Sequence, residues 1–207
     1  GEIAGQVRVL VRELDMLQAR FNIVLMGMGE PLHNYDATMK ALRILGDEHG
    51  LAVSPRRVTL STVGVLPALE RLASEPYMPN LAISLHSTFA AKRAELLPRA
   101  PRIDPAELVE LGERYARATH HPIQYQWTLL EGVNDGDDEL DGIARLLAGK
   151  YAVMNLIHYN AVAGLAYERV APDRAAAIAH ARYKRGVLTK LRDSARQDVE
   201  GSCGQLR

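Results

Sequence analysis

Short apolar runs alternate with longer amphipathic segments along this chain, a pattern typical of strands that are each followed by a helix. Residues 23–26 form an unbroken apolar run of the kind that a strand buried on both faces requires. Gly27 and Gly29 follow this run, and then come Glu30 and a proline. Because glycine allows the backbone to approach a ligand closely, we predict a buried strand that ends in a ligand-contacting turn carrying Glu30.

Four more strand-like runs begin near residues 57, 80, 123 and 152, and segments with helical periodicity separate them. Asp104, followed by a proline, has the features of a helix N-cap. The other predicted helices are 2–17, 34–47, 66–73, 137–147 and 175–184, and 187–191 could form one more short strand. In the first helix, the stripe expected to face the core is Ile3, Val7, Leu10, Leu14 and Leu17.

A series of strands joined through helices predicts an α/β fold with a parallel sheet, because such crossovers are right-handed. The spacing suits a barrel or a half-barrel. Polar residues gather at the predicted carboxyl ends of the strands, namely Gly29, Glu30, Ser61, Thr62, Ser84, His86 and Asn160. These ends form the active-site face of a parallel barrel, but an open, doubly wound sheet also binds ligands there. The pattern therefore predicts a site on a parallel sheet and leaves closure of the sheet open.

Composition narrows the class of protein. A chain of 207 residues with 47% apolar residues can form one domain with a substantial core. A single cysteine excludes an internal disulfide framework and favours a reducing, cytoplasmic setting. Lys plus Arg and Asp plus Glu number 25 each, so net charge gives no argument for a nucleic acid partner. No apolar run approaches the roughly 20 residues of a membrane helix, so no membrane partner is expected.

The segment from Met26 to Tyr35, Met-Gly-Met-Gly-Glu-Pro-Leu-His-Asn-Tyr, resembles a signature of the radical S-adenosylmethionine (SAM) RNA methyltransferases. These enzymes methylate an adenosine of 23S ribosomal RNA at ring carbon C2 or, in one branch, at C8. Further segments resemble the family's later motifs in the family's order: Arg57–Gly64, Asn80–His86, Arg93–Pro98, Leu129–Asp135, Asn155–Asn160 and Ser202–Leu206. Several motifs in the same order make the resemblance to this family strong, whereas any one of them alone would be weak evidence.

The resemblance implies a partial parallel (β/α) barrel of the radical SAM type over residues 1–207, without its first strand and cluster loop. A C-terminal tail from about residue 193 would carry the cysteine motif. In the family, a cysteine thiolate accepts a methyl group from one SAM, and Cys203 matches that position. Gly29 and Glu30 would bind the amino group of SAM. Its other groups would be held by Ser61, Ser84, Leu85, His86 and Asn160.

The family's reaction also requires a 4Fe–4S cluster held by Cys-x3-Cys-x2-Cys, and one thiol cannot hold it. We therefore expect no metal site in this chain, a cluster only in the full-length protein, and no activity from the chain alone. Gln126 stands where the family pattern has an acidic residue. The partners implied are ribosomal RNA, with transfer RNA open as a second substrate, and an electron donor such as flavodoxin. A monomer is expected, and adenine C2 is favoured over C8.

Two other functions are compatible with the sequence. The first is a non-catalytic barrel fragment of a degenerate gene that binds SAM or a nucleotide. The second is an unrelated barrel enzyme for a phosphorylated small molecule, which ranks last because no glycine-rich phosphate loop precedes a helix. A set of basic residues near the C-terminus could contact phosphates or form a solvated helix face: Arg182, Lys184, Arg185, Lys190, Arg192 and Arg196.

Overall fold

The computed structural model describes residues 1–26, 28–161 and 164–192. Its centre is a sheet of six parallel strands, each paired with the next strand along the chain. The strands are β1 (Ile23–Leu25), β2 (Val58–Thr62), β3 (Asn80–Ser84), β4 (Ile123–Leu129), β5 (Ala152–His158) and β6 (Thr189–Arg192). Because the strand order never reverses, the sheet has no switch point of the doubly wound type.

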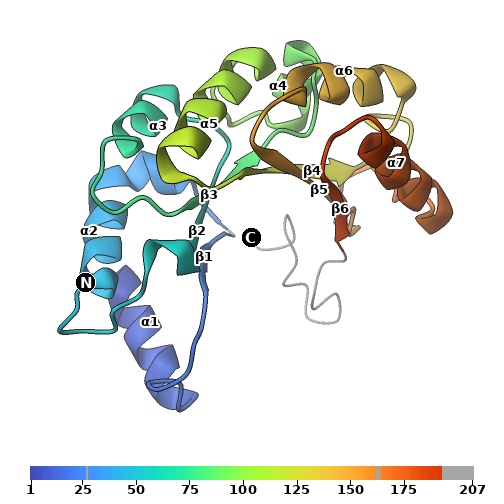
Figure 1. The fold of residues 1–207 in the computed structure, drawn as a ribbon. Coiled ribbons are helices and arrows are strands. Elements are labelled where there is room, and N and C mark those ends of the chain that lie inside the picture. The colour runs from blue at the N-terminus through green and yellow to red at the C-terminus, as the bar shows by residue number, and fades with distance from the viewer. Residues whose placement is uncertain (27, 162–163, 193–207) are drawn as a thin grey trace.

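Helices cover the outer side of this sheet. They are α1 (Glu2–Glu13), α2 (Tyr35–Gly46), α3 (Leu66–Leu72), α4 (Ala90–Leu96), α5 (Pro105–Thr119), α6 (Asp137–Leu147) and α7 (Pro172–Lys184), with 3-10 turns η1 (Pro31–Asn34) and η2 (Pro55–Arg57). Figure 1 shows the helices following the outside of an arch whose inner lining is the strands. The predicted partial α/β barrel is confirmed.

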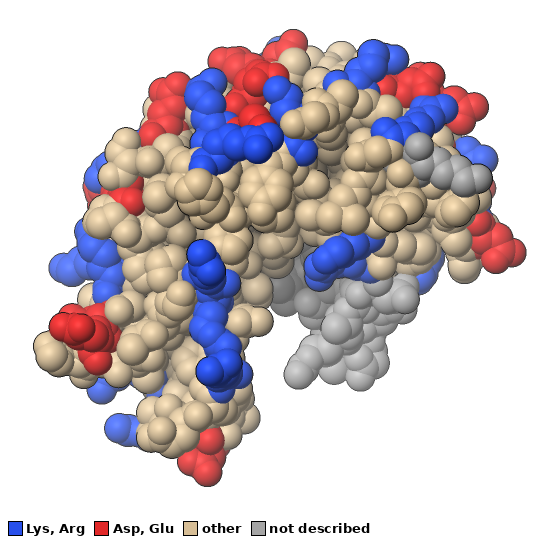
Figure 2. Space-filling view, viewed as in Figure 1, with Lys and Arg blue, Asp and Glu red and all other residues tan. Residues whose placement is uncertain are grey.

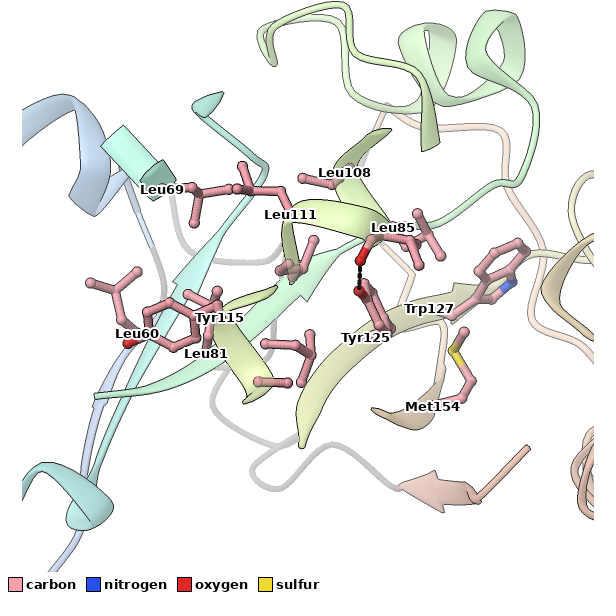
Figure 3. Packing of buried hydrophobic residues seen from close by; sticks show 14 of the residues in the cluster. Leu60, Leu69, Leu81, Leu85, Leu108, Leu111, Tyr115, Tyr125, Trp127 and Met154 are labelled. Atoms are coloured by element: carbon pink, nitrogen blue, oxygen red, sulfur yellow. Dashed lines mark hydrogen bonds between the residues drawn. The ribbon is translucent and has the colours of Figure 1, made fainter. Parts of the chain in front are cut away.

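The core fills the space between the strands and the outer helices. Successive residues of β4 alternate between buried and half-buried, so that Tyr125 and Trp127 face the helices while Gln124 and Gln126 face the concave side. Figure 3 shows Tyr125 beside Leu85, within the buried cluster that also includes Leu108 and Leu111 of α5. Its hydroxyl donates to the Val109 carbonyl oxygen at 3.3 Å, which provides a partner for a buried polar group.

Two expectations about the N-terminal region need correction. Val24 and Met26 are 58% and 51% exposed, so the run 23–26 is not buried on both faces; β1 is an edge strand. The expected stripe of α1 is only partly right, since Ile3 and Val7 pack against the core, whereas Leu10 is 58% exposed and the fully buried residues are Ala4 and Val11. Leu14 and Leu17 are exposed too, because the helix ends at Glu13. A helix at the end of its layer, packed mainly against α2, buries only a narrow stripe.

The other predicted elements are present, with boundaries that shift by a few residues. Asp104 caps α5 as expected, since its carboxylate accepts a hydrogen bond from the Ala106 amide at 2.7 Å. Helix α4 was not predicted, because it is short and its one buried residue is charged, namely Arg93. Among the described residues, no helix has both the length and the apolar character needed to cross a membrane.

Candidate functional site

Glu30 connects the carboxyl ends of β1 and β2. One carboxylate oxygen accepts a hydrogen bond from the Leu32 amide at 3.0 Å, and the other accepts from the Val63 amide at 2.8 Å. Gly29 precedes it with a φ of 87°, a backbone conformation that favours glycine. A pocket of about 430 Å³ lies against this turn, and the segment 96–100 forms its other wall. The carboxylate is therefore fixed at the rim of a cavity.

Ser61 and Ser84 lie on the concave face of neighbouring strands. Ser61 stands between buried residues of β2, and Ser84 is the last residue of β3. Both are half-buried, and neither hydroxyl has a hydrogen-bond partner among the described residues. A hydroxyl on a partly buried surface without a partner within the protein is available to a ligand. These two serines therefore keep their hydrogen-bonding capacity free at the inner face of the sheet.

His86 is held in a left-handed conformation, with a φ of 58°, just beyond β3. Its Nδ1 atom accepts a hydrogen bond from the Thr128 amide at 3.0 Å. Because a backbone N–H can only donate, the ring proton resides on Nε2, and the ring presents a donor there. Burial, with a smaller contribution in the same direction from the nearby cation of Arg93, lowers the pKa of His86 from 6.5 to about 4. His86 is therefore neutral at pH 7.

Leu85 contributes to the site only through its backbone. Its side chain is fully buried on the outer side of the sheet, where Figure 3 shows it beside Tyr125. Its amide, like that of His86, donates to the Gln126 carbonyl oxygen, at 3.0 and 3.4 Å respectively. The peptide of Leu85 and His86 is thus fastened to β4.

Arg93 fastens the ends of β2 and β3 from the outer side. This arginine is 2% exposed, and its Nη2 atom donates to the carbonyl oxygens of Val63 and Ser84, the second at 3.1 Å. Its Nε atom has no partner in the part of the chain that the structure describes. Burial lowers the pKa of the guanidinium below its ordinary value. The motif Arg93–Pro98 is visible in the sequence, but the local sequence does not indicate this role of Arg93.

Asn134 connects the carboxyl ends of β3 and β4 through hydrogen bonds, as Arg93 connects those of β2 and β3. It is fully buried, and its Nδ2 atom donates to the carbonyl oxygens of His86 at 2.8 Å and Thr128 at 2.9 Å. Its Oδ1 atom accepts from the Leu130 amide at 2.9 Å. Three hydrogen bonds to backbone atoms fix the conformation in which His86 is presented. Asn134 belongs to the motif Leu129–Asp135, but the local sequence does not indicate these contacts.

Glu139 of α6 is fully buried and anchors the turn after His86. Its Oε1 atom accepts from the Ser87 hydroxyl at 2.6 Å, and its Oε2 atom accepts from the Thr88 amide at 2.8 Å and hydroxyl at 2.6 Å. Lys92 lies 3.3 Å from the carboxylate. The N-cap residue of α6 is Gly136, and Glu139 lies in the first turn of the helix. The local sequence does not indicate its contact with the turn after His86.

Asn160 follows β5 by two residues and is buried, at 9% exposure. One strand, β4, separates it from His86 along the same edge of the sheet. The structure thus places all the described candidates, Gly29, Glu30, Ser61, Ser84, Leu85, His86 and Asn160, at the carboxyl ends of β1, β2, β3 and β5. Cys203 lies outside the described residues.

This arrangement offers SAM a suitable set of partners. A carboxylate at one end of the edge can pair with an ammonium group, while free hydroxyls and a neutral imidazole donor can bind a carboxylate or a ribose. A 4Fe–4S cluster held by three cysteines does not fit this chain, because its 207 residues contain only one cysteine. Within the described residues, no group of three or more His, Cys, Asp or Glu side chains could hold a metal ion.

Residues 3–147 match the radical SAM superfamily. The chain belongs to this superfamily. The radical SAM chain is 57% identical over its whole length to a probable RNA methyltransferase of Aromatoleum aromaticum, of which it covers 56%. It is 61% identical over 185 residues to a probable RNA methyltransferase of Methylibium petroleiphilum, of which it covers 52%. The chain therefore spans about half the length of the curated relatives it matches.

Solved structures agree with this assignment. A radical SAM methyltransferase from Sphaerobacter thermophilus superposes with a TM-score of 0.94 at 37% identity, covering 100% of this chain and 61% of that protein. A domain of the pyruvate-formate lyase-activating enzyme from Bacteroides vulgatus superposes with a TM-score of 0.64 at 16% identity, covering 84% of this chain and 99% of that domain. The second likeness shows the fold alone.

Proposed function

We propose that the carboxyl edge of this sheet binds SAM and that the complete gene product is a radical SAM methyltransferase of RNA. The observation that carries the proposal is the set of fixed but available polar groups at this edge, above all Glu30, Ser61 and Ser84. Membership of the superfamily and the similarity to probable RNA methyltransferases support it.

Each group has a role that its chemistry suits. Glu30, with Gly29, would bind the ammonium group of SAM, because a carboxylate held by two amides stays at the rim with its charge in place. Ser61 and Ser84 would donate to the carboxylate or the ribose. The Nε2 proton of His86 and the amide of Asn160 would bind the ribose and the adenine. Arg93 and Asn134 would keep these groups in position without touching the ligand.

The finer proposal concerns the reaction. Adenosine of 23S ribosomal RNA is the proposed substrate, with methylation at C2 favoured over C8, and Cys203 is the proposed carrier of the methyl group. A 4Fe–4S cluster supplies the electron that cleaves SAM in this superfamily, and its cysteines would have to come from outside this chain. We propose that residues 1–207 alone bind SAM without methylating RNA. An electron donor such as flavodoxin, a monomeric state and a cytoplasmic location remain predictions.

The test uses the complete gene product, reconstituted with iron and sulfide and supplied with methyl-labelled SAM, a reductant and 23S ribosomal RNA. We expect label on Cys203 by peptide mass spectrometry and 2-methyladenosine in the digested RNA. The variant Cys203→Ala is expected to abolish both signals while leaving SAM binding intact. Unlabelled Cys203 together with unmodified RNA would refute the proposed reaction. SAM binding without either signal would instead favour the non-catalytic alternative.

A further inference from the structure

The concave face of the sheet is free of acidic residues. The six described strands contain no Asp or Glu, and their only Lys and Arg residues are Lys190 and Arg192, both in β6. In the outer helices, by contrast, several basic side chains pair with carboxylates: Arg117 with Glu113 at 2.7 Å, for example, and Arg71 with Asp36 at 2.8 Å. Figure 2 shows basic and acidic side chains interspersed over the top of the arch, and basic side chains also under its right-hand half.

The two cations belong to the inner face of the sheet. Met154 and Leu156 of β5 are fully buried on the helix side, so Asn155 between them faces the concave side. Asn155 is the register partner of Lys190, and Arg192 lies two residues further along β6 on the same face. The sequence suggested a solvated helix face as one explanation of these residues. That explanation is wrong for both, since they lie on a strand that borders the concave surface.

Arg192 is held by a buried amide. Its Nε atom donates to Oδ1 of Asn155 at 3.0 Å, and Nδ2 of Asn155 in turn donates to Oε1 of Gln124 at 3.4 Å. Asn155 is 1% exposed, so this amide has a fixed orientation and cannot exchange its partners with water. Nε is the only guanidinium nitrogen of Arg192 that has a partner among the described residues, and no carboxylate there pairs with Arg192 or Lys190.

A guanidinium oriented through Nε presents its two Nη groups to a ligand, and such a pair matches an oxyanion. Arg192 ends β6, so it lies at the same carboxyl edge as the proposed SAM site. We infer that Arg192, with Lys190 and the orienting Asn155, forms a subsite for a phosphate of the RNA substrate. This inference rests on the proposed function, because it names the group by which that substrate is held.

The carboxylate of SAM is the other oxyanion that could occupy the subsite, and the sheet argues against it. The ammonium and carboxylate groups of SAM are attached to the same carbon atom. The ammonium is assigned to Glu30 after β1, whereas Arg192 is in β6, five strand spacings of about 4.8 Å away along the sheet. One amino acid moiety cannot reach both ends, so the anion at Arg192 has to come from the second substrate.

The experiment measures two affinities of the complete gene product. One is for a fluorescently labelled RNA hairpin with an adenosine in its loop, at several salt concentrations, and the other is for SAM by calorimetry. For Arg192→Gln we expect RNA affinity to fall about tenfold. The slope of the logarithm of RNA affinity against the logarithm of salt concentration should fall by about 0.7 to 0.9, as expected for one lost phosphate contact. The SAM dissociation constant should stay within twofold.

Three further variants separate charge from structure. Asn155→Asp keeps Arg192 but gives it an internal counter-charge, so RNA affinity should fall as much as in Arg192→Gln. Arg192→Lys keeps the charge but loses the Nε contact, so the salt slope should stay and the affinity should be intermediate. Arg117→Gln, which removes a paired cation on the outer layer, should bind RNA like the wild type. Melting temperatures identify any variant that is misfolded.

The outcomes separate this inference from the proposed function. If the wild type binds and methylates RNA while Arg192→Gln does so with unchanged affinity and salt slope, the subsite is refuted and the function stands. Weaker SAM binding with unchanged RNA binding in Arg192→Gln would assign the subsite to the carboxylate of SAM and also refute the inference. If the wild type binds no RNA, both proposals fall.

Discussion

His86 illustrates how single residues of this edge divide their chemistry between the fold and a ligand. One ring nitrogen accepts a backbone hydrogen bond from β4, and the other is left as a donor. The left-handed backbone of this residue is compatible with that arrangement because the Asn134 amide holds its carbonyl oxygen. Because Nδ1 of His86 can accept this hydrogen bond only when the ring is neutral, the stability of the protein should depend on pH.

The pKa of His86 is lowered from 6.5 to about 4 in the folded protein. Between these values the unfolded chain binds more protons than the folded chain, so acid favours unfolding. The contribution of neutral His86 to the free energy of unfolding is present above pH 6.5 and is lost as the pH falls towards about 4. His86→Gln should therefore show a smaller loss of unfolding free energy than the wild type between about pH 7 and about pH 5. Urea titrations measure this, and the exposed His33→Gln is the control.

Asn134→Ala tests the fixation of the strand ends. Truncation removes three hydrogen bonds to backbone groups, of which the one from the Leu130 amide is buried and the two to carbonyl oxygens are partly buried. We expect a loss of about 2–4 kcal/mol in the free energy of unfolding, measured by denaturant titration. Asn22→Ala, at an exposed position, should change it by less than about 0.5 kcal/mol. Equal stability of the two variants would show that Asn134 has no such role.

Elements that follow one another in the chain were largely predictable, whereas the contacts that fix the site were not. Alternation in β4 and the N-cap of α5 depend on neighbouring residues, and the structure confirms both. Arg93, Asn134 and Glu139 instead bind groups on other elements, 51 residues away in the case of Glu139 and Thr88. Local periodicity carries no sign of such partners. Only part of the α1 stripe was predicted correctly for a related reason, since burial depends on which neighbours a helix has.

Helix α6 holds the turn after β3 through Glu139, and the substitution Glu139→Gln tests this contact because it changes only one oxygen of the side chain. Glu139→Gln replaces an acceptor by an NH₂ group, which then faces donors of Ser87 or Thr88. We expect a loss of about 1–3 kcal/mol in the free energy of unfolding, together with weaker SAM binding by the complete gene product. Asp138→Asn, its exposed neighbour on the same helix, should retain both properties. A variant Glu139→Gln with wild-type stability would contradict the anchoring role.

At the scale of the whole molecule, the half-barrel has two different polar surfaces: the outer helices and the concave face of the sheet. Helices carry most of the charge on the outside, and the sheet presents serines, amides and two cations to the concave side. The fold class and the position of the candidate site were predictable, because parallel strands bring their carboxyl ends to one edge. The orientation of Arg192 was not predictable, since it depends on the register of β5 with β6 and on one buried amide.

The central claim is that this edge binds SAM, and the most direct test is the SAM dissociation constant of the complete gene product with and without its two free hydroxyls. Ser61 and Ser84 have no internal hydrogen-bond partner among the described residues, so Ser61→Ala/Ser84→Ala should leave the melting temperature unchanged. We expect its SAM dissociation constant to rise about tenfold, as two lost hydrogen bonds require. Ser54→Ala/Ser74→Ala, at exposed positions, is the matched control. Unchanged SAM affinity in a folded Ser61→Ala/Ser84→Ala protein would contradict the account.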